Sequence, residues 1–76
     1  GKGIATAAVK LISRLGFRKL GFTRLEIVVA EQNRVSQRVA EKVGAVREGV
    51  HRNRHIVRDK TYDSVMFSLI PQDLQE

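Results

Sequence analysis

Residues 24–50 read RLEIVVAEQNRVSQRVAEKVGAVREGV, and this stretch decides the fold because it joins a β-branched run, a helical run and a second extended run. In the first run, Leu25–Ala30, the odd positions carry large aliphatic side chains and the even positions carry Glu26, valine and alanine. Since the second face is also nearly apolar, the pattern predicts a strand that is covered on both sides.

The helical run follows this strand directly. Asn33 belongs to the residue types preferred as helix caps, and Gly44 is well placed to end the helix. Between them, Val35, Val39 and Val43 recur one helical turn apart. The spacing therefore predicts that these valines form the buried stripe of the helix.

A second helix is predicted on the N-terminal side of this stretch, from Ile4 to about Leu20, with Gly21 as its left-handed cap. Its apolar positions recur at helical spacing and predict an inward face made of Ile4, Ala8, Leu11, Ile12, Leu15 and Leu20.

Two extended segments are predicted on the C-terminal side, over residues 45–57 and 62–70, with a turn around RDKT (58–61). Pro71 should stop the last strand, and residues 71–76 should form a loose tail. The order is helix, strand, helix, strand, strand, which predicts an α/β (α+β) fold with a three-stranded sheet packed by two helices. An α/β unit normally has a strand before its first helix, so we expect residues 1–70 to be part of a larger domain.

The composition is that of a globular protein with a basic surface. The 76 residues carry a formal net charge of +6, which favours anionic partners such as phosphate, nucleic acid or an acidic protein surface. Only 5% of residues are aromatic, so few rings are available to stack on the bases of a single-stranded nucleic acid. No apolar stretch reaches the roughly 20 residues of a membrane span, and the absence of cysteine excludes disulfides and thiolate metal sites. A cytoplasmic protein is the default expectation.

The opening residues GKGIAT are a candidate anion site. Glycine lets a backbone approach a ligand closely, and amides at a helix start are unpaired, so Gly1, Gly3, Ala5 and Thr6 could cradle a phosphate group. An ordinary loop-to-helix turn explains the same residues. A Walker loop needs Ser or Thr after Gly-Lys and therefore fails at Gly3. A Rossmann fingerprint stays open as a weaker alternative: Glu31 fits its acid after the second strand, but Thr6 replaces its third glycine and two adjacent extended segments do not continue a parallel winding.

Two further constellations carry candidate residues. Asn33 and Ser36 are three residues apart at a helix start and share a face, although plain capping explains them equally well. His51 and His55 are four apart in an extended segment and should point to the same side. No third ligand accompanies the histidines, so no metal site is predicted, while a role for His55 as a general base stays open.

Four segments together resemble the C-terminal half of a GNAT-superfamily N-acetyltransferase, most closely the branch that acetylates ribosomal-protein alanine. These segments, in order and spacing, are GKGIAT (1–6), RLEIVVAEQNRVS (24–36), EKVGAVREGV (41–50) and YDSVMFSLI (62–70). The resemblance implies a partial GNAT fold that lacks the first four strands and first two helices of the family. It also implies a fragment that is expected to be inactive alone.

The resemblance further implies where acetyl-CoA binds. The family holds the pyrophosphate of this cosubstrate with backbone amides of a Gln/Arg-x-x-Gly-x-Gly/Ala loop, and Gly3 and Ala5 match its last two defined positions. The leading Gln or Arg would fall before Gly1. The implied cofactor-binding residues are Gly1, Lys2, Gly3, Ile4, Ala5, Thr6, Asn33 and Ser36.

The catalytic residues implied by the resemblance are Ser36 and His55. Many members of the superfamily carry a tyrosine as general acid seven residues after the asparagine, where this chain has Ala40. The ribosomal branch has a serine three residues after the asparagine, so Ser36 is the implied donor of a proton to the leaving thiolate. His55 lies near the place where this branch holds a base.

The resemblance predicts an enzyme that moves an acetyl group from acetyl-CoA to a protein N-terminal or similar amine. Exposed arginines could attract an acidic acceptor protein. An alternative is a small basic nucleic-acid-binding module, although the sequence contains no known nucleic-acid-binding motif. A third possibility is a non-catalytic fragment that pairs with a separate N-terminal half, or with itself, through the exposed strand Leu25–Ala30.

Overall fold

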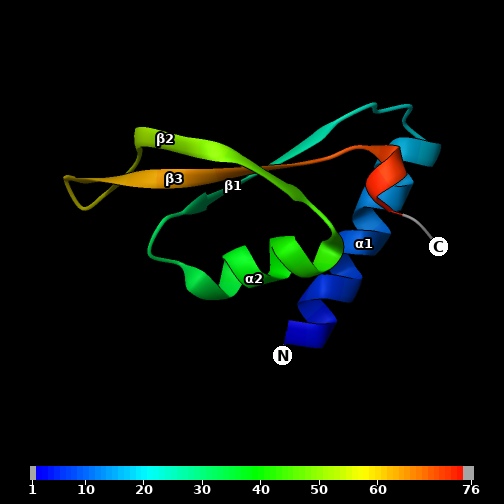
Figure 1. Cartoon of the computed structure of the whole chain (residues 1–76), viewed down its shortest axis with the longest axis horizontal. Helices are drawn as coiled ribbons and strands as arrows, with labels where there is room; N and C mark the ends of the chain where they lie inside the picture. The colour runs from blue at the N-terminus through cyan, green and yellow to red at the C-terminus, as the bar shows by residue number, and fades with distance from the viewer. Residues whose placement is uncertain (1, 75–76) are drawn as a thin grey trace.

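The structure, a computed structural model, describes residues 2–74, which form a three-stranded sheet with two helices (Figure 1). The sheet order is β1-β3-β2, and both pairings are antiparallel. Figure 1 shows α2 lying along one side of the sheet, while α1 crosses beside α2 and leads into the start of β1. This arrangement confirms the predicted α+β order. The elements are α1 (Lys2–Arg18), β1 (Leu25–Ala30), α2 (Arg34–Val43), β2 (Val46–Val57), β3 (Lys60–Leu69) and the short 3-10 helix η1 (Pro71–Asp73).

The core lies between α2 and the face of the sheet that carries the odd-numbered residues of β1 and β3. The register pairs Val29 with Val65 and Ile27 with Phe67, so these side chains share one face. Val65 and Phe67 are almost completely buried there, and Ala40 of α2 packs against them. This small cluster is the main apolar contact of the described chain.

The helix α2 begins and ends as predicted, but its inward face is rotated from the valine stripe. Asn33 accepts a hydrogen bond from the Ser36 amide, and Gly44 takes a left-handed φ of 99° as the C-cap. Ala40 and Val43 are buried, whereas Val35 is 56% exposed. Of the predicted valine stripe, Val43 is buried and Val39 is half-buried, but Val35 is wrong as a core residue, because α2 turns Ala40 toward the sheet instead.

The helix α1 turns its apolar stripe away from the rest of the described chain, which corrects the prediction for its inward face. Ser13 is buried, and its hydroxyl donates to the Val9 carbonyl at 2.7 Å. By contrast Ile4 is 75% exposed and Leu11 is 66% exposed. The helix packs mainly against α2 through its small and polar side, and nothing within residues 2–74 covers the other side.

The second face of β1 also differs from the prediction. No described helix covers it, and Val28 is only half-buried there, so this strand is not enclosed on both sides. Besides this open face, β1 is an edge strand, because β3 is its single neighbour in the described sheet.

The hairpin β2–β3 turns at Arg58 and Asp59, inside the predicted 58–61 turn. Both residues have positive φ, 51° and 65°, which is the signature of a type I′ hairpin turn. Neither residue is glycine, so the turn holds two side chains in a left-handed conformation that L-residues adopt at a cost.

We expect Asp59→Gly to raise the free energy of unfolding by about 0.5–1 kcal/mol, because glycine adopts φ of 65° without that cost. Urea denaturation followed by circular dichroism measures the change. Lys60→Gly, at the first residue of β3, is the matched control and should destabilise the protein. Equal effects of the two changes would contradict the assignment of strain to residue 59.

The predicted loose tail is wrong for residues 71–74. Pro71–Asp73 form the turn η1, in which the Ile70 amide donates to the Asp73 carboxylate at 2.9 Å and the Leu74 amide donates to the Pro71 carbonyl at 3.2 Å. The proline pre-sets the first position of this turn, and the carboxylate caps it. The last two tail residues lie outside the described part of the chain.

Candidate functional site

A groove with a volume of about 380 Å³ runs between α1, α2 and β1. Its walls are mostly small or aliphatic side chains, so main-chain atoms come close to the empty space. The lining residues are Ala5, Val9, Ile27, Val28, Val29, Ser36, Val39 and Ala40. An apolar groove with one hydroxyl suits an apolar, flexible part of a ligand that ends in a polar group.

The groove brings together two residues that the sequence placed in separate motifs. Ala5 stands in the first turns of α1, and Ser36 stands in the first turn of α2. Both line the groove. Ser36 is half-buried, and its hydroxyl makes no recorded hydrogen bond within residues 2–74.

The first turn of α1 differs from the prediction, because the helix begins at Lys2 and Gly3 is helical. The amides of Lys2, Gly3 and Ile4 have no carbonyl one turn earlier in the helix. No acidic side chain stands in this turn to neutralise the positive end of the helix dipole. The local electrostatics therefore favour an anion. Gly1 lies outside the described residues, and of Lys2 only the backbone is described.

Neither backbone conformation nor a contact within the described residues requires glycine at position 3. A Cβ built at this position meets no atom within 4 Å, and its φ is not in the left-handed region. Glycine inside a helix costs up to about 1 kcal/mol relative to alanine. Gly16 offers a contrast, since a Cβ there would lie 3.0 Å from the Phe22 ring. Close approach by a group from outside the described chain would explain Gly3.

Asn33 acts as a helix cap in this structure. Its side-chain oxygen accepts the Ser36 amide hydrogen at 3.1 Å, and Asn33 is not among the residues that line the groove. Capping therefore accounts for this asparagine, and its contact with a cofactor stays a prediction. The half-buried Thr6 is likewise outside the groove lining.

The structure does not bring His55 to the groove. His55 lies on β2, two strands away from β1, and its ring Nδ1 contacts the Ser64 hydroxyl. The cross-strand partners of His51 and His55 are Ser64 and Tyr62, which are two residues apart and so share a face. No cluster of three metal-ligating side chains occurs among the described residues. The catalytic role of His55 stays a prediction.

The walls of the groove were not identified from the sequence. Ile27 and Val29 fit the pattern of a buried strand, and Val9 fits the pattern of a buried helix face. Hydrophobic periodicity therefore could not show whether these residues line a groove or lie in the core. The edge position of β1 is what exposes these side chains to the groove.

A second hollow, of about 600 Å³, lies past the C-terminal end of β1, and its lining residues are Glu31, Gln32, Arg34, Thr61, Tyr62 and Asp63. It is open and shallow, and it does not include the first turn of α1. The smaller groove is the better candidate site, because it joins a helix start to an apolar channel.

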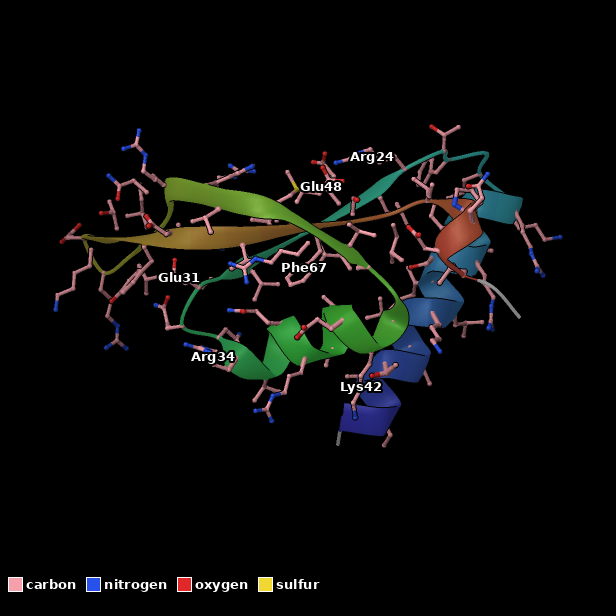
Figure 2. The ribbon with its side chains drawn as sticks, in the orientation of Figure 1. Arg24, Glu31, Arg34, Lys42, Glu48 and Phe67 are labelled. Atoms are coloured by element: carbon pink, nitrogen blue, oxygen red, sulfur yellow. The ribbon has the colours of Figure 1, made fainter. Side chains whose placement is uncertain are left out.

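A polar cluster ties the three strands on the sheet face opposite α2. Figure 2 shows Arg24 and Glu48 on that side, while Phe67 lies on the α2 side. The Ser68 hydroxyl donates to the Glu48 carboxylate at 2.5 Å, and Arg24 donates to Glu48 at 3.3 Å and to Glu26 at 3.1 Å. The hydrogen bond from Ser68, followed by that from Arg24, holds the pKa of Glu48 below its usual value. The hydrogen bonds to Glu26 and Glu48 raise the pKa of Arg24.

The lowered pKa of Glu48 predicts a pH-dependent contribution to stability. Since the folded state binds the proton less tightly than the unfolded state, the stabilisation is present above the unfolded pKa of about 4.3 and is lost as pH falls through the folded pKa. Glu48→Gln should therefore lower the urea midpoint at pH 7 and have little effect at pH 3. Glu41→Gln, an exposed site on α2, is the control and should show no such difference.

Comparison with known proteins identifies the relatives of this fold. A model of the acetyltransferase (GNAT) domain family matches residues 1–46. The chain is 34% identical over 73 residues to the "Putative ribosomal N-acetyltransferase YdaF" of Bacillus subtilis, covering 96% of this chain and 40% of that protein.

Solved structures give the same result. A "putative ribosomal-protein-serine acetyltransferase" from Vibrio cholerae is 36% identical with a TM-score of 0.82, over 91% of this chain and 40% of that one. The ribosomal-protein-S5-alanine acetyltransferase of Vibrio fischeri is 25% identical with a TM-score of 0.88, over 100% of this chain and 42% of that one. The chain thus spans about 40% of the length of the curated relatives it matches. Neither helix of the described range is long and apolar enough to cross a membrane.

Proposed function

Because the chain belongs to the GNAT acetyltransferase family, we propose that residues 2–74 form the part of an N-acetyltransferase domain that binds the acetyl donor, acetyl-CoA. The observation that carries this proposal is the groove that joins the first turns of α1 to the apolar walls of β1 and α2. The complete reaction, moving an acetyl group to a protein N-terminal or similar amine, is proposed for the whole domain of which this chain matches about 40%.

The residues of the groove, together with the α1 start that precedes Ala5, fit the chemistry of this cosubstrate. The free amides of the first α1 turn would bind its diphosphate, and Gly3 leaves space for that group. Aliphatic side chains such as Val9 and Val39 would pack against its pantetheine arm. When bound, acetyl-CoA supplies an activated acetyl thioester.

Ser36 is the proposed general acid. Its hydroxyl lines the groove and has no recorded partner in the described chain, so it is available to give a proton to a departing sulfur. Ala40, which stands where many relatives of this superfamily carry a tyrosine, offers no competing hydroxyl. The proposal leaves the general base outside the described groove lining.

Titration with coenzyme A, followed by ¹H–¹⁵N correlation spectra of the 76-residue protein, tests this proposal. We expect the amide signals of Gly3–Thr6 and of Ser36 and Val39 to shift together. Shifts confined to the β2–β3 hairpin would indicate binding to its exposed arginines alone. An absence of shifts at Gly3–Thr6 at millimolar coenzyme A would refute the proposal.

The acceptor is proposed to be a protein amine, and a cytoplasmic setting fits a cysteine-free chain. The relatives named above include proteins described as acting on ribosomal proteins. Exposed basic residues on β2 and its turn would favour an acidic surface on the acceptor; they are Arg47, Arg52, Arg54 and Arg58. The nucleic-acid alternative gains little from the aromatic side chains, because Phe67 is buried, Phe17 and Tyr62 are half-buried, and Phe22 alone among the described residues is an exposed aromatic.

The open side of α1 predicts self-association, or pairing with the complementary part of a domain. Leu11 and Leu15 are more than half exposed on one face of the helix. Burying such side chains is favourable by about 1–2 kcal/mol each. In sedimentation experiments at high concentration we expect oligomers, and Leu11→Glu should convert them to monomers.

Val57→Glu is the control for this change, because Val57 is also about half exposed (51%) but lies on the hairpin. It should leave the oligomers unchanged. A wild-type protein that sediments as a monomer at millimolar concentration would contradict self-association through α1.

A further inference from the structure

One face of α2 is exposed, and only one of its side chains belongs to the groove. Val35, Arg38, Val39 and Lys42 stand at positions i, i+3, i+4 and i+7, so they lie on a common face of the helix, which we call the outer face. Val35 is 56% exposed, and Arg38 and Lys42 are exposed as well. Val39 is half-buried and lines the groove, so the outer face borders the groove directly.

The two cations of the outer face have no opposite charge beside them in the described part of the chain. Neither Arg38 nor Lys42 makes an ion pair with another residue of the range 2–74, although Glu41 stands three residues from Arg38. Like charges four residues apart on a helix repel each other. Lys42 in the last turn is favourable for the helix dipole, but Arg38 lies too far from that end to gain from it. An anion bound from outside would relieve the repulsion.

The outer face lies on the side of α2 where α1 begins. Ala40 packs toward the sheet, and Lys42 follows it by about 200° around the helix, so Lys42 points away from the sheet. Figure 2 shows Lys42 on this side of α2, where the start of α1 also lies. The two helices pack on each other, and the groove joins Ala5 of α1 to Val39 of α2. The outer face therefore adjoins both the groove and the proposed diphosphate site.

An exposed apolar side chain beside two cations suits a nucleotide, which combines a flat base with phosphate groups. Arginine and lysine are the side chains that bind phosphate best. Coenzyme A ends in such a nucleotide, an adenosine with a 3′-phosphate, joined through the diphosphate to the pantetheine arm. With the diphosphate at the α1 start and the arm in the groove, the adenosine is left outside the groove and next to the outer face.

We infer that the outer face of α2 binds the adenosine end of coenzyme A, with Arg38 and Lys42 on the 3′-phosphate and the adenine against Val35. The two cations then distinguish acetyl-CoA from acyl donors that lack this phosphate. The course of the pantetheine arm rests on the proposed function, whereas the affinity of the outer face for a nucleotide does not.

The role of the two cations is tested by calorimetry of the 76-residue protein with coenzyme A and with 3′-dephospho-coenzyme A. Each exposed ion pair contributes roughly 1.4- to 5-fold in affinity, so coenzyme A should bind about 2- to 25-fold more tightly than the dephospho form. The double variant Arg38→Gln/Lys42→Gln should bind the two ligands equally. Equal affinities in the wild type, or a ratio that the double variant does not change, would overturn the inference.

Arg52→Gln/Arg54→Gln is the matched control, since it removes two exposed cations from β2 and so changes the net charge equally. It should leave the ratio of the two affinities unchanged. An equal loss of the ratio in both double variants would show that net charge, and not the outer face, discriminates between the ligands. All four positions are exposed, and thermal unfolding checks that the variants keep the fold.

The nucleotide contact is tested separately with adenosine 3′,5′-bisphosphate, which lacks the pantetheine arm. In ¹H–¹⁵N correlation spectra the signals of Val35, Arg38 and Lys42 should shift, while inorganic phosphate should leave Val35 unmoved. Equal shifts with inorganic phosphate would indicate an adventitious ion only, and no shifts with the bisphosphate at millimolar concentration would also overturn the inference.

Failure of this inference is distinguishable from failure of the proposed function. If coenzyme A shifts Gly3–Thr6 but neither ligand shifts Val35 or Lys42, the inference alone fails. If the bisphosphate shifts Val35 and Lys42 but coenzyme A leaves Gly3–Thr6 unmoved, the proposed function fails and the nucleotide contact stands.

Discussion

Phe67→Ala is expected to remove a large share of the free energy of unfolding. Phe67 is 2% exposed and lies between β3 and α2, in contact with the cluster that contains Val65 and Ala40 (Figure 2). Removing a buried phenylalanine ring costs about 3–5 kcal/mol. A chain of 76 residues has a total stability of only about 4–11 kcal/mol, so this single change removes much of it.

The change is measured by urea unfolding at constant protein concentration, because association through α1 would otherwise shift the midpoint. Phe22→Ala is the matched control, since Phe22 is the same residue type at 47% exposure and should cost much less. A cost below about 1 kcal/mol for Phe67→Ala would mean that the cluster around Val65 is not the core. The prediction is independent of any ligand.

Gly3→Glu is expected to weaken coenzyme A binding by about 10- to 100-fold without destabilising the fold. The Cβ of the new side chain meets no atom within 4 Å, and an acidic residue in a first helical turn is favourable for the helix. The same carboxylate would repel a diphosphate and fill the space in front of the free amides. Loss of one charge-assisted hydrogen bond, of about 1.5–3 kcal/mol, gives a change of about that size.

Calorimetry or the amide shifts of Ser36 measure the affinity, and thermal unfolding checks the fold. Gln72→Glu adds the same charge at an exposed position of η1 and should leave the affinity within about twofold. Equal affinities of wild type and Gly3→Glu would show that the α1 start is not the anion site. The proposal that the groove binds acetyl-CoA would then lose its main support.

Elements and turns were predictable because they depend on local chemistry. The β-branched run at Leu25–Ala30, the cap at Asn33 and the left-handed glycine at Gly44 each act within a few residues, and each was found where expected. The tail was mispredicted because the Asp73 carboxylate accepts the Ile70 amide hydrogen and closes a turn that begins at Pro71, which composition alone does not reveal.

The candidate site could be predicted only in part. Ala5 and Ser36 came from motif positions, and the structure places both on one groove. Its walls, including Val9 and Val39, could not be separated from core residues, because the same aliphatic side chains serve both purposes. The distance of His55 from this groove follows from the strand order β1-β3-β2, which no local pattern contains.

The sequence by itself determined the type of each element, because helix periodicity, β-branching and capping are properties of neighbouring residues. Tertiary structure alone decided which faces are buried. The stripe of Ile4 and Leu11 has the pattern of a core, yet it is exposed, because α1 packs on α2 through its smaller side around Ser13. Hydrophobic patterning indicates which face of an element is apolar, but the elements that pack beside it decide whether that face is buried.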